Sequence, residues 1–95
     1  MEIQEAYKQK MAAQLKEWSA EIKLIEAKLE NAGADLKVRR AEELDDLRVK
    51  QRAAHEKLQE MEKASGEAWE QLKRTADNIW EDLKTGVADA RSKFK

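Results

Sequence analysis

The chain has 95 residues, of which 41% are charged, with three glycines, no proline and no cysteine. This length permits one domain, taken as residues 1–95, and the composition is typical of long helices or coiled coils. Nineteen basic and twenty acidic residues give a net charge of −1, and with no strongly basic face we expect no nucleic-acid binding. The absence of cysteine excludes disulfides and thiolate metal sites, and the lack of a long apolar segment predicts a soluble, cytoplasmic protein.

A row of large apolar residues recurs at intervals of eleven through most of the chain. It consists of Ile25, Leu36, Leu47, Leu58, Trp69 and Trp80. Eleven residues make three helical turns at about 3.67 residues per turn, so the members of the row fall near one helix face. The row therefore predicts an all-α fold of amphipathic helices that pack on other helices.

Residues 2–30 predict the first helix. Its apolar residues alternate in spacing between four and three, which is a heptad pattern sustained for nearly three repeats. They are Met11, Leu15, Trp18, Ile22, Ile25 and Leu29. Leu24 lies at the margin of this seam.

The stretch 31–35 has two readings. Gly33 can end the first helix, with Asp35 as the N-cap of the next one. Alternatively, one glycine flanked by alanines can lie inside a helix at a cost of about 1 kcal/mol. The eleven-residue interval from Ile25 to Leu36 is kept across this stretch, which favours a continuous helix.

Residues 35–63 are expected to be helical, with a less regular apolar face. The inward residues are expected to be Leu36, Leu44, Leu47, Ala54, Leu58 and Met61, and the polar Arg40 and Gln51 share their face. Ser65-Gly66 predicts a turn, because serine is a common N-cap and glycine adopts the left-handed conformation easily.

Residues 67–94 predict the last helix, which contains an internal repeat. Trp69-Glu70-Gln71-Leu72-Lys73 recurs eleven residues later as Trp80-Glu81-Asp82-Leu83-Lys84, followed by Val87 and Phe94. An apolar face of this kind is typical of a bundle core, and eleven-residue amphipathic repeats with Trp and Phe also suit a lipid surface.

The sequence carries no recognisable catalytic constellation. His55 is the only histidine, so no histidine pair can hold zinc or a di-iron centre, and we expect it at the surface. The carboxylates alternate with cations, as they do on solvated helix faces, and acidic residues directly follow the basic cluster Lys37, Arg39 and Arg40. We therefore expect no enzyme, no catalytic or metal-ligating residues and no cofactor.

The segment 64–73, Ala-Ser-Gly-Glu-Ala-Trp-Glu-Gln-Leu-Lys, and the later Trp80-Glu81-Asp82-Leu83-Lys84 resemble a bacterial family of small coiled-coil proteins. The N-terminal spacing of Tyr7, Met11, Leu15 and Trp18 is similar too. Some cyanobacterial members of that family carry a stress-response label. The resemblance implies a helix that runs through Gly33, and it brings no catalytic residues.

The favoured architecture is an antiparallel helical hairpin with a long helix over about 2–63 and a return helix over about 67–94. The return helix would leave the stripe of residues 7–29 uncovered, which predicts an antiparallel homodimer that covers it. The alternative is a monomeric three-helix bundle with a turn at 31–35. Both arrangements bury the same faces locally and differ at the hinge.

The predicted function is that of a non-enzymatic structural or interaction coiled-coil protein with a stress-associated role. Its partners would be a second copy or another protein. The alternative is an amphipathic-helix protein that binds a membrane surface through residues 67–94. Because residues 65–95 carry six acidic and six basic residues, anionic lipid would gain little from this segment, and self-association is favoured.

Overall fold

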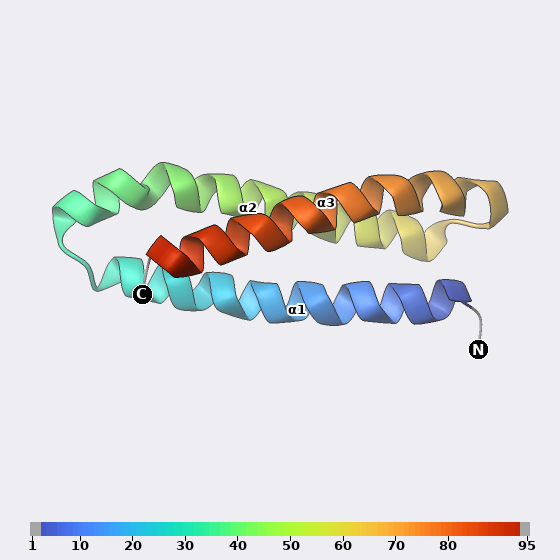
Figure 1. Ribbon diagram of the computed structural model, residues 1–95, viewed down its shortest axis with the longest axis horizontal. Coiled ribbons are helices and arrows are strands. Elements are labelled where there is room, and N and C mark those ends of the chain that lie inside the picture. Colours follow the sequence, from blue (N-terminus) through green and yellow to red (C-terminus); the bar gives the residue numbers. More distant parts are fainter. Residues whose placement is uncertain (1–2, 94–95) are drawn as a thin grey trace.

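The computed structural model describes residues 3–93, and these form three consecutive helices without any strand (Figure 1). The helices are α1 (Ile3–Glu30), α2 (Ala34–Lys63) and α3 (Gly66–Lys93). The prediction of an all-α fold is confirmed, and the helix count agrees with the three-helix alternative. Each helix runs antiparallel to the one before it, in a bundle with principal extents of 50 × 21 × 18 Å.

The expected continuous helix over 2–63 is wrong, because the chain turns at residues 31–33. The side-chain amide of Asn31 donates a hydrogen bond to the Ala27 carbonyl at 3.1 Å, and Ala32 N–H donates to the Leu29 carbonyl at 3.1 Å. Gly33 is the N-cap of α2 with φ −65° and ψ 159°, a conformation that ends one helix and starts another. Local hydrogen bonds thus satisfy the Ala27 and Leu29 carbonyls at the end of α1.

The apolar stripe of α1 is covered within the same chain. Met11, Leu15, Ile22, Ile25 and Leu29 are all buried. The expectation that residues 7–29 would stay uncovered is therefore wrong, because the turn brings both α2 and α3 onto α1. A second chain is not required to bury this stripe.

The predicted turn at Ser65-Gly66 is confirmed. Ala64 follows α2 in an extended conformation and donates its N–H to the Met61 carbonyl. Gly66 has φ +51°, in the left-handed region that glycine adopts without a side-chain clash. It does so as the first residue of α3 rather than as the cap of α2.

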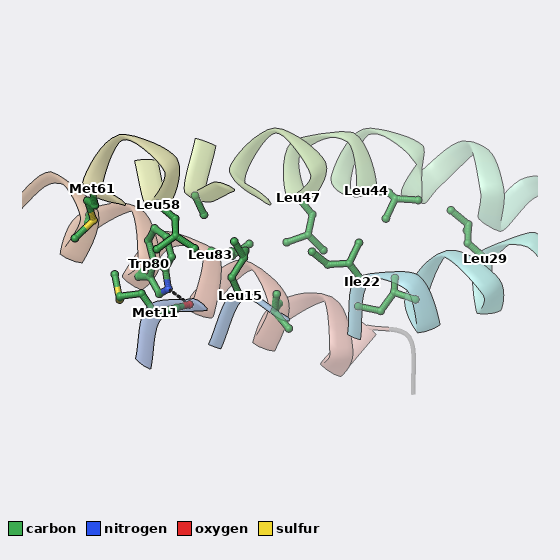
Figure 2. Close-up of a cluster of buried hydrophobic side chains, with 14 of the residues drawn as sticks. Met11, Leu15, Ile22, Leu29, Leu44, Leu47, Leu58, Met61, Trp80 and Leu83 are labelled. Carbon is green, nitrogen blue, oxygen red and sulfur yellow. Dashed lines mark hydrogen bonds between the residues drawn. The ribbon is translucent and has the colours of Figure 1, made fainter. Parts of the chain in front are cut away.

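The core is a single cluster that all three helices share (Figure 2). Its buried members are Met11, Leu15, Ile22, Ile25, Leu29, Leu44, Leu47, Ala54, Leu58, Met61, Trp69, Ala76, Trp80, Leu83 and Val87. The Trp80 indole is buried and donates its Nε1–H to the Met11 carbonyl at 3.3 Å, so the one polar atom of that ring has a partner. Phe94 lies outside the described residues.

Leu36 is the member of the eleven-residue row that the bundle does not bury. It is 38% exposed, so the expectation that it points into the core is wrong. Lys93, the last described residue of α3, pairs with Glu43 at 3.1 Å. The described part of α3 thus ends about two helical turns before Leu36 and does not cover it.

Candidate functional site

The seam between α1 and α2 has two sides, and α3 covers one of them. On the other side an open groove is lined by residues of α1 and α2 alone. It consists of two adjoining hollows of about 500 Å³ each, with Leu15 and Leu58 at the floor. The described helices therefore leave one face of the bundle without a covering helix.

Small residues of α1 make this groove hollow. Ala12 and Ser19 lie seven residues apart, close to two helical turns, and therefore on the same flank of the α1 stripe. Gln51 Nε2 donates to the Ser19 hydroxyl at 2.8 Å and joins the two helices at the groove floor. This hydrogen bond explains why a polar residue occupies a half-buried position on the apolar face of α2.

The rim of the groove is predominantly cationic. Its charged lining comprises the four cations Lys16, Lys23, Arg48 and Arg52 and one carboxylate, Glu26. Arg48 Nε donates to Glu26 at 3.0 Å, and this hydrogen bond is the main reason why the pKa of Arg48 is raised. Within residues 3–93 the other three cations take part in no ion pair. They are available to an acidic ligand.

His55 lies at this groove as an exposed residue, which agrees with its expected surface position. Its Nε2 atom is 3.4 Å from the amide nitrogen of Gln59. Across residues 3–93 no group of three or more His, Cys, Asp or Glu side chains is arranged to hold a metal ion.

The basic cluster at the start of α2 is divided by the fold. Lys37 and Arg39 are exposed, whereas Arg40 is half-buried and pairs with Glu43 at 3.0 Å. Lys93 donates a second hydrogen bond to Glu43 from α3, and Lys93, with Arg40, holds the pKa of that carboxyl below its ordinary value. The contacts of Arg40 and Lys93 with Glu43 join α2 to α3.

The aromatic face of α3 faces the core. Trp69, Trp80, Leu83 and Val87 are buried there. A lipid-binding role for this face requires α3 to leave the bundle. No helix in the described range is long and apolar enough to cross a membrane.

The start of α3 is fixed to α1 by an aromatic cluster. The Tyr7 and Trp69 rings meet edge to face, with centroids 5.5 Å apart and an interplanar angle of 86°. The Tyr7 hydroxyl donates to Asp77. Lys8 Nζ lies over the Trp69 ring at 5.6 Å from its centroid, and Lys73 Nζ lies over the Tyr7 ring at 5.4 Å. Burial, followed by the hydrogen bond and negative charge of Asp77, raises the pKa of Tyr7.

Sequence reasoning missed the groove, because the apolar spacing does not show which side of a two-helix seam a third helix takes. The signal present in the sequence was the set of small and basic residues on one flank of the α1 stripe. Comparisons of the chain with protein-family models, curated proteins and solved structures give no match, so the role of this groove is argued from its own geometry.

Proposed function

We propose that this protein is a non-enzymatic structural or interaction protein that acts through helix-to-helix association, and that a second copy is its first partner. The observation that supports this proposal is Leu36. It continues the row of Leu47 and Leu58 but is 38% exposed, whereas Leu47 is 3% exposed. The apolar face of α2 thus extends beyond the part that residues 3–93 of one chain cover.

An antiparallel dimer that exchanges α1 would cover this residue. In such a dimer α1, the turn and α2 form one continuous helix, and each α1 lies on α2 and α3 of the other copy. The contacts of the closed chain are kept, and the two hinge regions meet around the two-fold axis. Leu36 would be covered there by the hinge of the second copy.

Gly33 is the position at which the balance between the closed turn and the continuous helix can be altered. Gly33 has a negative φ, and a Cβ atom placed on it would meet nothing within 4 Å. Alanine therefore fits the closed turn, and it is better than glycine inside a helix by about 1 kcal/mol. Gly33→Ala should thus favour the continuous helix of the exchanged dimer.

Light scattering over a concentration series tests the proposal. We expect the mass to rise from the single-chain 11.0 kDa toward twice that value, at lower concentration for Gly33→Ala than for the unchanged chain. Leu36→Lys should reduce the dimer fraction, whereas Val49→Lys, at a 60% exposed valine on the same helix, should leave it unchanged. A constant mass of 11.0 kDa for all four proteins would contradict self-association.

The alternative of a lipid-surface protein is tested by tryptophan fluorescence with anionic vesicles. Removing α3 from the bundle would expose Leu47, Leu58 and their neighbours to water. This exposure costs a free energy of about 25 cal/mol per Å² of apolar surface. We therefore expect an unchanged emission spectrum at physiological salt. A blue shift with co-sedimentation would favour the lipid role.

The proposal places the protein in the cytoplasm and gives it a stress-associated role. The role rests on the resemblance to small bacterial coiled-coil proteins. Growth of a deletion strain under heat and salt stress tests it, and a fluorescent fusion tests the location. Normal growth under both stresses would contradict the stress-associated role.

A further inference from the structure

We propose that the open groove between α1 and α2 binds an acidic amphipathic helix of another protein. This site goes beyond self-association and does not depend on it. The groove is the side of the seam that α3 leaves uncovered, with Leu15 and Leu58 at its floor. A helix placed there would complete a four-helix arrangement.

The groove has the shape that a helix needs. Its α1 wall extends from Ala12 to Glu26, which corresponds to roughly 20 Å of helix and a ligand of about 14 residues. The small side chains of Ala12, Ser19 and Ala20 let a neighbouring helix approach closely. The apolar face of the ligand would rest on the two leucines.

The charge of the groove identifies the polar residues of the ligand. Lys16 and Lys23 line it from α1 and Arg52 lines it from α2, so cations stand on both walls. Asp or Glu residues on both flanks of the ligand helix would pair with these cations. The apolar face between the two flanks would contact the apolar floor of the groove. A helix with basic flanks would meet like charge on both sides.

The apolar floor separates this ligand from other polyanions. Nucleic acid would gain from the cations but not from the leucines, and its binding needs a larger basic surface than a chain of net charge −1 supplies. The position of the cations on the two walls, with apolar surface between them, matches an amphipathic helix.

Fluorescence anisotropy with a designed pair of labelled peptides tests the inference. Both peptides have about 14 residues and the same Leu and Ala face, with Glu on the flanks of one and Lys on the flanks of the other. We expect saturable binding of the Glu peptide, weakened by added salt, and none of the Lys peptide. In the complex, the backbone amide NMR signals of Ser19 and His55 should shift.

A matched pair of double variants locates the site. Lys16→Glu with Arg52→Glu reverses two cations of the groove, whereas Arg39→Glu with Arg74→Glu reverses two exposed cations outside it. Both variants change the net charge by the same amount. The groove variant should bind the Glu peptide roughly tenfold more weakly than the control variant does.

Three results would overturn the inference. They are equal binding of the two peptides, equal loss of binding in the two double variants, and the absence of saturable binding. Tighter binding of a single-stranded RNA oligonucleotide or of anionic vesicles than of the Glu peptide would also overturn it. If light scattering gives a dimer mass and any of these results is also found, the groove inference fails but the proposed self-association is supported.

Discussion

The two sides of the α1–α2 seam differ in what the chain places on them. On one side α3 brings buried, apolar side chains such as Trp80 and Leu83 onto the seam. On the other side Leu15 and Leu58 reach a groove that is rimmed by cations and that no helix within residues 3–93 covers. One apolar seam can thus serve two purposes. Its covered side stabilises the fold, and its open side is available for binding.

The largest effect is expected for Leu83→Ala on the covered side. Leu83 is fully buried, so its truncation leaves a cavity that should lower the free energy of unfolding by about 2–5 kcal/mol. Urea denaturation followed by circular dichroism measures this loss. A change below about 1 kcal/mol, close to the cost at an exposed site, would mean that α3 does not hold the seam together.

Trp80→Phe should have the next largest effect. The substitution removes the indole Nε1–H and leaves the buried Met11 carbonyl without that 3.3 Å hydrogen bond. The smaller Phe ring also leaves a space in the core, so we expect a total loss of about 1–3 kcal/mol in the free energy of unfolding, measured by the same denaturation. Stability equal to that of the unchanged chain would show that the contact between α1 and α3 is not formed.

Tyr7→Phe should cost less and should change the pH dependence of stability. Removing the hydrogen bond to Asp77 should cost about 0.5–1 kcal/mol at neutral pH, since Tyr7 is only partly buried. The folded-state pKa of Tyr7 is raised, so its contribution is complete below the ordinary tyrosine pKa of about 10 and is lost as the pH rises toward the folded-state value.

The alkaline loss of stability should therefore be steeper in the unchanged chain than in Tyr7→Phe. Thermal melts in buffers on both sides of the ordinary tyrosine pKa measure the difference. Parallel curves for the two proteins would exclude a stabilising contact between Tyr7 and Asp77.

Leu24→Ala should have the smallest effect, because this residue lies outside the seam. Leu24 is 51% exposed, beside a hollow that Ala88 and Arg91 also line. We expect a change within about 0.5 kcal/mol in the free energy of unfolding. Equal midpoints for Leu24→Ala and Leu83→Ala would mean that the core has been placed wrongly.

The helices could largely be predicted from the sequence, whereas the path between the first two could not. The heptad spacing from Met11 to Leu29 and the Ser65-Gly66 break both correspond to what the structure contains. The eleven-residue interval favoured a continuous helix, yet it is equally compatible with a turn. The Asn31 side chain donates a hydrogen bond to the Ala27 carbonyl and so helps end α1. The spacing of apolar residues cannot predict this bond.

The candidate site depends on which side of the α1–α2 seam α3 packs against, and the apolar periodicity of the sequence does not show this. Ala12, Ser19 and Lys23 could have been seen to share one flank of α1. Whether that flank is covered or open depends on the side of the seam that α3 takes. The same reason explains Leu36, whose position on the apolar row predicted burial that the described part of α3 does not supply.

A single distance tests most directly whether the chain folds back to form this two-sided seam. The chain has no cysteine, so Lys23→Cys and Arg52→Cys give two unique sites for spin labels. Both residues line the open groove. In a closed bundle the labels should be on the order of 20 Å apart, since packed helix axes lie about 8–10 Å apart. Pulsed electron–electron double resonance at low total protein concentration, where the exchanged dimer is not populated, should give this short distance. An intrachain distance of roughly 44 Å, as in one continuous helix at 1.5 Å per residue, would contradict the closed bundle.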